Sequence, residues 1–202
     1  AVNSQYVFVG NTGNSIEVFT RSNMNQVTTY IFSSSYINYA WGMSLNSAGN
    51  KLAVASYFGN KISEFTVSGN SLNYVRGTST SYSSSNGYFK RPTDTAYDSS
   101  GNIYATDLIN HRIQKFNSSL VYQGKLGSFS STSGFRHPYG MTIDSNDKIY
   151  VADFNNYAVR QYDTGLNETI TYGGAAGTRL SAAKKVIKKI VSNTDLTSGA
   201  NF

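Results

Sequence analysis

The sequence predicts an all-β fold built from repeated antiparallel sheets, with one amphipathic α-helix near the C-terminus. Three observations support this prediction. Ser, Asn, Gly, Tyr and Thr dominate the 202 residues and only two prolines occur, a composition that suits short strands and polar turns. A hairpin pattern recurs at regular spacing, and a segment close to the end has helical periodicity. We therefore expect a β-sheet domain over residues 1–174 and a helical segment over 175–202.

Four segments align without gaps over fourteen residues and define the repeat. Each has a short alternating strand, a polar turn of four or five residues and a second strand closing on an aromatic side chain, which is typical of a β-hairpin. The four copies are YVFVGNTGNSIEVF from Tyr6, LAVASYFGNKISEF from Leu52, IYATDLINHRIQKF from Ile103 and IYVADFNNYAVRQY from Ile149.

Two further strands flank these hairpins. Strands that end in a polar turn precede the last three hairpins, and another strand follows each of the four. Four antiparallel strands in each unit of 40 to 50 residues are typical of the blades of a β-propeller. The preceding strands are predicted at 41–46, 92–98 and 138–144, and the following strands at 28–32, 71–76, 120–126 and 169–172.

The third and fourth copies resemble the NHL repeat. In the fourth, a Pro-x-Gly strand ending in Asp leads to Ile-Tyr-Val-Ala-Asp153, then to Asn156 and a basic residue before the last strand. The first two copies are degenerate, with Gly10 and Ser56 aligned with Asp107 and Asp153. The resemblance covers residues 5–174 and implies a propeller fold. NHL propellers include RNA readers, protein-binding platforms, surface proteins and some lyases, so the resemblance leaves the function open.

The first blade is expected to be incomplete, because residues 1–5 leave too little chain for an inner strand and its turn. Either the ring closes by borrowing a strand, or the sequence belongs to a longer protein. The resemblance implies about six blades, which favours a fragment or a ring completed by a partner.

An amphipathic helix is predicted over residues 178–192, with four lysines on its polar face. The segment from Arg179 to Phe202 resembles the first helix of von Willebrand factor A domains, as in bacterial type IV pilus tip adhesins. In that family the helix follows a metal-binding Asp-x-Ser-x-Ser loop. The nearest match, Asp98-Ser99-Ser100, occupies a turn that recurs in neighbouring blades, so we interpret it as a blade turn. The apolar positions of the predicted helix are Leu180, Ala183, Ile187, Ile190 and Val191.

Composition limits the functions that the sequence supports. The chain has no cysteine, which excludes disulfides and thiolate metal sites, and no apolar run long enough to span a membrane. A cysteine-free surface rich in Ser, Asn and Tyr is common on exported bacterial proteins, so we expect an extracellular or cell-surface location. The net charge is +6, but residues 1–174 contribute only +2 of it, which weakens a nucleic-acid interpretation.

Catalytic chemistry has little support in the sequence. His111 falls in a hairpin turn and His137 precedes a proline, and two separate histidines are too few for the usual zinc site of a propeller lyase. Asp107 and Asp153 end equivalent strands, so we expect each carboxylate to cap backbone amides in its own turn. No catalytic residue, metal site or cofactor is therefore predicted.

The sequence favours one surface for binding, formed by the hairpin turns and by the segments that enter each blade. Its aromatic and amide side chains suit sugar or protein contacts, and its cations would also suit RNA. We predict a non-enzymatic binding or scaffold module of an adhesin-like bacterial surface or pilus protein, with a protein, glycan or remaining part of the parent protein as partner. The alternatives are an intracellular propeller that binds RNA or protein, and a propeller lyase. The predicted face comprises Asn14, Tyr57, Phe58, Asn60, Lys90, Arg91, Leu108, Asn110, His111, Arg136, His137, Phe154, Asn155, Asn156 and Tyr157.

Overall fold

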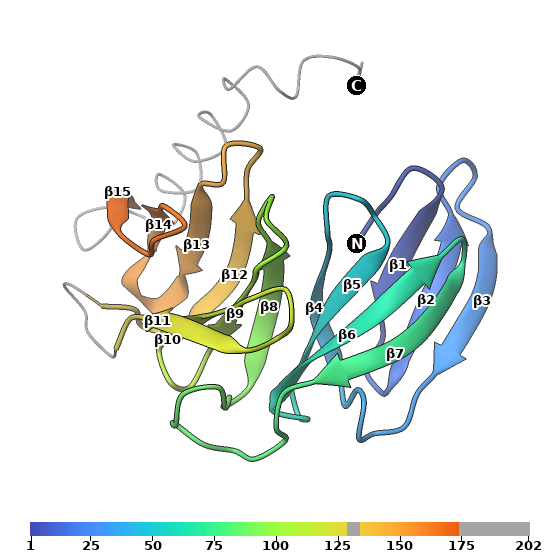
Figure 1. Cartoon of the computed structure of the whole chain (residues 1–202), viewed down its shortest axis with the longest axis horizontal. Coiled ribbons are helices and arrows are strands. Elements are labelled where there is room, and N and C mark those ends of the chain that lie inside the picture. Colours follow the sequence, from blue (N-terminus) through green and yellow to red (C-terminus); the bar gives the residue numbers. More distant parts are fainter. Residues whose placement is uncertain (129–133, 174–202) are drawn as a thin grey trace.

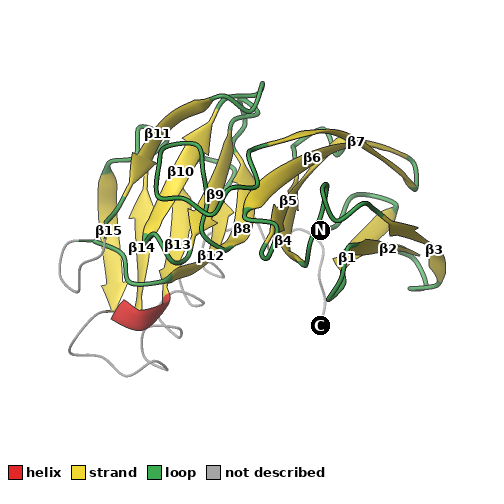
Figure 2. Ribbon diagram, turned by 90° about the horizontal axis from the view of Figure 1, so that it is seen from below, coloured by secondary structure: helices red, strands yellow, loops and turns green. Residues whose placement is uncertain are grey.

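The computed structural model describes residues 1–128 and 134–173, which form four antiparallel sheets (Figure 1). Seen from below, the sheets stand side by side in an arc that runs from β1–β3 to β12–β15 (Figure 2). The all-β prediction and the four repeated units are confirmed. The predicted helix over 178–192, its von Willebrand factor A-like resemblance and the segment 175–202 lie outside the described residues. Within the described part of the chain, no helix is long and apolar enough to cross a membrane.

Each sheet is a meander whose strands pair in chain order. The first strands of the last three sheets, β4, β8 and β12, lie next to one another and form the inner wall of the arc. The first sheet contains β1 (Tyr6–Gly10), β2 (Ser15–Thr20) and β3 (Gln26–Ile31), and the second β4 (Ala40–Leu45), β5 (Lys51–Ser56), β6 (Lys61–Ser68) and β7 (Ser71–Gly77). The third contains β8 (Pro92–Tyr97), β9 (Ile103–Asp107), β10 (Arg112–Phe116) and β11 (Tyr122–Leu126). The fourth contains β12 (Pro138–Ile143), β13 (Ile149–Asp153), the 3-10 turn η1 (Phe154–Asn156), β14 (Ala158–Tyr162) and β15 (Glu168–Gly173).

The hydrophobic core consists of three clusters, one at each junction between neighbouring sheets. Alternate residues of a strand point to opposite faces of its sheet, so the middle sheets bury side chains on both faces. In β9, for example, Ile103 packs toward the second sheet and Tyr104 toward the fourth, and both are fully buried. We call the sheets blades one to four.

The first blade departs by one residue from the gapless alignment. In blade two Leu52 pairs with Phe65, whereas in blade one Val7, and not Tyr6, pairs with Phe19. The hairpin turn of blade one absorbs the difference, and Phe8 thereby faces the core between blades one and two. The alignment of Gly10 with Asp107 is therefore wrong, because Asn11 occupies that position.

Blade one also contains more of its inner strand than expected. Val2 forms a β-bridge with Val7, and Ala1 and Phe8 exchange two backbone hydrogen bonds. Asn3 then caps the turn into β1 by accepting two backbone N–H groups. The expectation that residues 1–5 are too few for any inner strand and turn is corrected, although only a short part of the strand is formed.

The same side-chain cap recurs in every blade. Oδ1 of Asp98 accepts the backbone N–H groups of Ser100 and Asn102, as Asn46 and Asp144 do in their own turns. Side chains of this type stabilise turns by replacing a backbone acceptor. The Asp98 segment is thus a blade turn, as the sequence predicted, and its carboxylate is engaged in capping.

Asp107 and Asp153 fix the segments that enter blades three and four. Oδ1 of Asp107 accepts the backbone N–H of Lys90 at 2.8 Å, and Oδ2 pairs with Nε of Arg112 at 2.8 Å. Asp153 holds Arg136 and Arg160 in the same way. Both carboxylates are fully buried. The expected cap on the residue's own turn is therefore corrected, since the backbone amide that each binds belongs to the entering segment.

Candidate recognition face

One end of the arc is built from two kinds of segment that repeat from blade to blade. The turns between β5 and β6, β9 and β10, and β13 and β14 lie there, together with the segments that enter β4, β8 and β12. Main-chain hydrogen bonds tie each entering segment to the turn of its own blade, as from Tyr57 to Tyr39 and from Asn155 to Arg136. The side chains of this face are therefore carried on a rigid backbone.

A continuous row of aromatic rings crosses this face from blade two to blade four. Phe58 contacts Tyr57, which stacks on Trp41, which contacts Tyr139, which contacts Phe154. The successive ring centroids are 4.9, 4.8, 5.8 and 5.9 Å apart, within the range of favourable aromatic pairs. We call these five residues the aromatic track.

The aromatic track is open to solvent although its rings are large and apolar. Phe58 and Phe154 are 51% and 54% exposed, and Trp41 is 40% exposed. Tyr39 packs beside the track, with its ring centroid 5.3 Å from that of Trp41. Contiguous exposed aromatic side chains of this kind are typical of binding surfaces. On an ordinary surface, exposed apolar side chains are scattered singly.

Arg91 adds a cation to one end of the aromatic track. Its guanidinium lies 5.4 Å from the ring centroid of Tyr57 and 5.8 Å from that of Phe58. Nη1 also donates to the Tyr57 hydroxyl at 3.4 Å. The side chain remains exposed, so the stacked guanidinium can still donate hydrogen bonds to a ligand.

The inner strands explain how rings from blades two and four meet. Trp41, Thr93 and Tyr139 occupy equivalent positions in β4, β8 and β12. Thr93 is small and buried, and its Oγ1 donates to the backbone oxygen of Tyr139 at 2.6 Å. Because blade three offers no ring at this position, Trp41 and Tyr139 make contact across it.

Asp94 lies one residue further along β8, at a cavity between the inner strands. Gly42 and Gly140 hold the equivalent positions in the neighbouring blades, and a Cβ on Gly42 would collide with the Asp94 carboxylate. Oδ2 of Asp94 accepts the backbone N–H of Met141 at 2.9 Å. Burial raises the pKa of Asp94 to about 6, against the effect of its backbone hydrogen bonds. The cavity has a volume of about 280 Å³ and is lined by Met43, Ser44, Leu45, Asp94, Thr95, Ala96, Tyr97, Met141, Thr142 and Ile143.

The two histidines, distant in sequence, lie against each other on the same face. Their ring centroids are 4.4 Å apart, and Nδ1 of His111 accepts the backbone N–H of His137 at 3.1 Å. Nδ2 of Asn155 lies 2.6 Å from Nδ1 of His137. Burial and the neighbouring His137 and Arg136 lower the pKa of His111.

The structure brings together most of the side chains predicted for the binding face, in two groups. Tyr57, Phe58, Asn60 and Arg91 form the first group, around the turn of blade two. The second group surrounds the histidine pair and comprises His111, Arg136, His137, Phe154 and Asn155. Lys90 instead lies over the ring of Tyr82, and Tyr157 is exposed at the edge.

Four predicted residues serve the fold instead. Leu108 is 8% exposed and packs inward. Asn110 donates to the backbone oxygen of Ser83, and the buried Asn156 donates to that of Gly134, so both amides anchor entering segments. Asn14 donates to the backbone oxygen of Phe32 within blade one.

Four residues of this region were not predicted. Trp41 and Tyr139 both precede a glycine in equivalent strands, and this shared position was a signal that could have marked them. Asp94 breaks the same pattern by replacing that glycine. Tyr39 gave no comparable signal, because its role follows from packing against Trp41.

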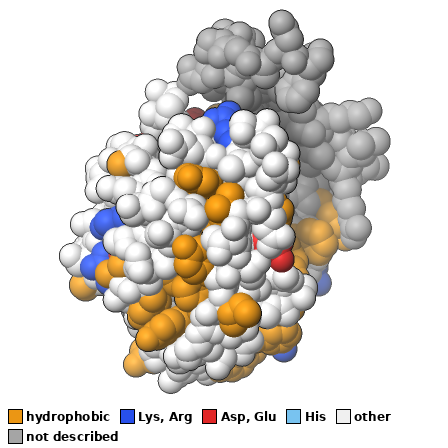
Figure 3. Space-filling view, turned by 90° about the vertical axis from the view of Figure 1, so that its right-hand side faces the viewer, with side chains coloured by type: hydrophobic (Ala, Val, Ile, Leu, Met, Phe, Trp, Pro, Cys, Tyr) orange, Lys and Arg blue, Asp and Glu red, His pale blue; other side chains and the backbone are white. Residues whose placement is uncertain are grey.

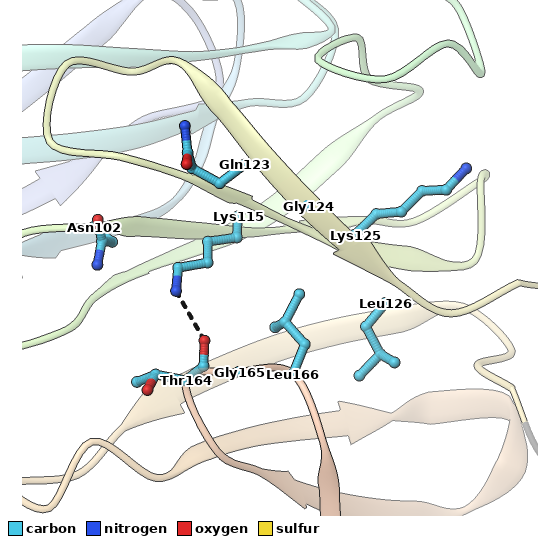
Figure 4. A pocket seen from close by; sticks show the side chains of 9 residues that line it. All are labelled: Asn102, Lys115, Gln123, Gly124, Lys125, Leu126, Thr164, Gly165 and Leu166. Carbon is cyan, nitrogen blue, oxygen red and sulfur yellow. Dashed lines mark hydrogen bonds between the residues drawn. The ribbon is translucent and has the colours of Figure 1, made fainter.

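A second cavity lies between blades three and four at the opposite end, away from the aromatic track. It has a volume of about 550 Å³, and Lys115 reaches across it to donate to the backbone oxygen of Thr164 at 2.8 Å (Figure 4). This contact joins β10 to the turn after β14. The lining residues are Asn102, Lys115, Gln123, Gly124, Lys125, Leu126, Thr164, Gly165 and Leu166. Within the described residues, no group of three or more His, Cys, Asp or Glu side chains is placed to hold a metal ion.

Residues 89–116 and 135–162 match the family model of the NHL repeat. These segments extend from the entering segment to the third strand of blades three and four. Blades three and four thus each contain one match to the NHL repeat. The NHL resemblance of these two copies is thus confirmed, and the match includes no residue beyond 162. Among curated proteins, no sequence matches this chain.

Solved structures show the same fold. A catalytically inactive virginiamycin B lyase from Staphylococcus aureus, with quinupristin, aligns with a TM-score of 0.67 and 15% identity over 90% of this chain. A streptogramin B lyase aligns with a TM-score of 0.67 and 12% identity, again over 90% of the chain. The chain spans 56% and 55% of those two proteins, respectively. At these identities the likeness shows the propeller fold alone.

Proposed function

We propose that this chain is a non-enzymatic recognition module that binds a glycan along the aromatic track. The observation that carries the proposal is the unbroken row of five rings from Phe58 to Phe154, of which all but the half-buried Tyr57 are exposed. Sugar rings present apolar C–H faces and hydroxyl edges, so they suit aromatic surfaces with hydrogen-bonding neighbours. Arg91 and Asn155 supply such neighbours at the two ends. We propose a bacterial cell-surface location, which fits this role and is supported by the cysteine-free composition rich in Ser, Asn and Tyr.

A binding assay with paired variants tests this proposal. Immobilised neutral, amino-sugar and uronic-acid polysaccharides are the probes, with immobilised collagen as a protein surface. We expect saturable binding to at least one polysaccharide. Replacing Trp41 and Phe58 by Ala together should weaken it about tenfold or more, because hot-spot aromatics contribute most of the binding energy. Val121→Ala removes an apolar side chain of similar exposure away from the face, and should leave binding unchanged.

Other outcomes would redirect the proposal. Binding to collagen alone would make the partner a protein. Binding to single-stranded RNA that weakens steeply with salt would favour the intracellular RNA-binding alternative. Equal polysaccharide binding by the Trp41/Phe58 variant would remove the aromatic track from the site.

The lyase alternative rests on the fold that the chain shares with the virginiamycin B lyase and the streptogramin B lyase. Incubation with quinupristin, followed by mass spectrometry and chromatography, tests it. We expect the compound to elute unchanged, and its conversion to any product would overturn the non-enzymatic proposal.

A further inference from the structure

Neighbouring blades are joined on the recognition face by a repeated hydrogen bond. In each case the residue just before an inner strand donates its backbone N–H to the hairpin turn of the preceding blade. Tyr39 donates to the backbone oxygen of Gly13 at 2.6 Å, Arg91 to Oδ1 of Asn60 at 3.2 Å, and His137 to Nδ1 of His111 at 3.1 Å. We call these bonds the first, second and third clasps.

The second and third clasps share their backbone geometry. Asn60 and His111 occupy the same turn position, with φ of 53° and 54°, and Arg91 and His137 both have φ of 57°. Positive φ is uncommon for side chains other than glycine and strains the backbone. The clasp helps to hold this strained arrangement, so the identity of the acceptor atom matters.

The acceptors differ in one chemical property. The carbonyl oxygen of the first clasp and the amide oxygen of the second accept a hydrogen bond throughout the neutral and mildly acidic range. Nδ1 of His111 accepts only while the imidazole is neutral, because protonation turns that nitrogen into a donor. A protonated His111 would direct an N–H group at the backbone N–H of His137.

Charged groups on both sides of the third clasp affect this protonation. From blade four, His137 and Arg136 disfavour a positive charge on His111, and Asp153 favours it. On the same hairpin as His111, Asp107 is neutralised by Arg112. The His137 ring, whose centroid lies 4.4 Å from that of His111, thus disfavours the protonated form of His111 at close range.

The third clasp supports the blade-four end of the aromatic track. His137 is separated from Tyr139 by Pro138 alone, and Asn155, which contacts His137, follows Phe154. We propose that protonation of His111 opens the third clasp, displaces Tyr139 and Phe154, and weakens ligand binding in acid. This regulation rests on the proposed function for its effect on binding. The opening itself is independent of any ligand.

The sign of the pH effect follows from the neutral acceptor. Burial and the adjacent cations lower the pKa of His111 from its ordinary value of 6.5, so the clasped state favours the neutral ring. The stabilisation is therefore present above that pH and is lost as the pH falls through the lowered pKa. We expect the opening to have its midpoint below pH 6.5.

Trp41 provides a direct optical readout of the opening. It is the sole tryptophan of the chain, and its ring centroid lies 5.8 Å from that of Tyr139. Because Asp94, whose pKa is raised to about 6, lies just below the track, all measurements use the Asp94→Asn background. We expect Trp41 fluorescence and the NMR amide signal of His137 to change together below pH 6.5.

Two exchanges between the clasps make the test specific. His111→Asn installs the acceptor of the second clasp in the third, and should abolish both pH transitions. Asn60→His makes the reverse exchange, and should give the Arg91 amide a new transition. Transitions that persist in His111→Asn, or that are absent from the Asp94→Asn background itself, would overturn the proposal.

Binding of a polysaccharide identified in the panel separates this proposal from the function it rests on. We expect affinity to fall about three- to tenfold from pH 7.5 to 5 in the Asp94→Asn protein, and to stay constant with His111→Asn added. A clasp that opens without any fall in affinity would overturn the regulatory proposal while the glycan site stands. If no polysaccharide binds at any pH, the proposed glycan function fails, and the proposed regulation of binding fails with it. The fluorescence and NMR transitions then test only whether the third clasp opens.

Discussion

Asp94 shows how one residue can depart from a repeat and be accommodated by its neighbours. Gly42 and Gly140 leave space for its carboxylate, which accepts the backbone N–H of Met141 and so links β8 to β12. Buried Asp107 and Asp153 each pair with an arginine, whereas no basic side chain of the described residues forms a salt bridge with Asp94. The cost of burying the charge therefore remains, and it appears as the raised pKa.

Replacing Asp94 should change how stability depends on pH. The pKa of Asp94 is raised from 3.8 to about 6, so its stabilising effect is complete below pH 4 and is lost as the pH rises through 6. The shift corresponds to about 1–3 kcal/mol after allowance for partial exposure. We expect Asp94→Asn to remove this loss. Urea unfolding of both proteins from pH 4.5 to 8 measures it, and equal pH slopes would contradict the prediction.

A buried ion pair holds each of the segments that enter blades three and four. The arginines of the two pairs occupy different positions within their blades. Arg112 begins β10, whereas Arg160 lies in the middle of β14, yet the Nε of each meets an equivalent aspartate at 2.8 Å. Blade two has Ser56 at the aspartate position, and its Oγ accepts the N–H of Asn38 at 2.7 Å. The tie to the entering segment is thus retained while its chemistry changes.

Removing one partner of the blade-three pair should be costly. Arg112 is 3% exposed, so Asp107→Ala would leave its charge buried and the backbone N–H of Lys90 without its acceptor. We expect a loss of about 3–5 kcal/mol in the free energy of unfolding. Asp163→Ala, which removes from the turn between β14 and β15 a carboxylate that pairs with no arginine of the described residues, is the control and should cost less. Comparable losses in the two variants, measured by chemical denaturation, would show that the pair is not the cause.

Sequence periodicity was enough to place the strands of this fold, because alternation and turn residues are local signals. The predicted strands at 71–76 and 138–144 differ by one residue from β7 and β12. The error in blade one arose from a hairpin one residue shorter than that of blade two, which a gapless alignment could not accommodate. The position before glycine could have marked Trp41 and Tyr139, but the contacts along the aromatic track and between His111 and His137 depend on packing between blades, which no local pattern reveals.

Two titratable groups near the recognition face have opposite effects on the stability of the whole molecule when the pH falls. Acidification relieves the buried charge of Asp94 and disrupts the acceptor role of His111. Their effects on overall stability therefore oppose each other in the mildly acidic range below pH 6.5. A flat melting temperature in that range would be compatible with a large local change at the aromatic track, which is why a probe at Trp41 is more informative than thermal unfolding.

The outward flank of blade one exposes apolar side chains that the inner blades bury. Val9 and Ile31 are 41% and 77% exposed, whereas the residue that matches Val9 in blade two, Val54, is fully covered. Figure 3 shows hydrophobic side chains gathered on this side of the molecule. In the other blades the equivalent face packs against a neighbouring sheet. An apolar sheet face left open in this way favours association with another sheet.

We therefore expect this chain, expressed alone, to self-associate in a concentration-dependent way. Replacing Val9 and Ile31 by Lys should shift it toward the monomer, because charges on the flank oppose burial of that face. Lysines at Val75 and Val121, which are also exposed but lie on other blades, serve as the matched control and should leave association unchanged. Size-exclusion chromatography with light scattering distinguishes these outcomes. A monodisperse monomer of the unaltered chain at high concentration would show that the flank of blade one is stable in water.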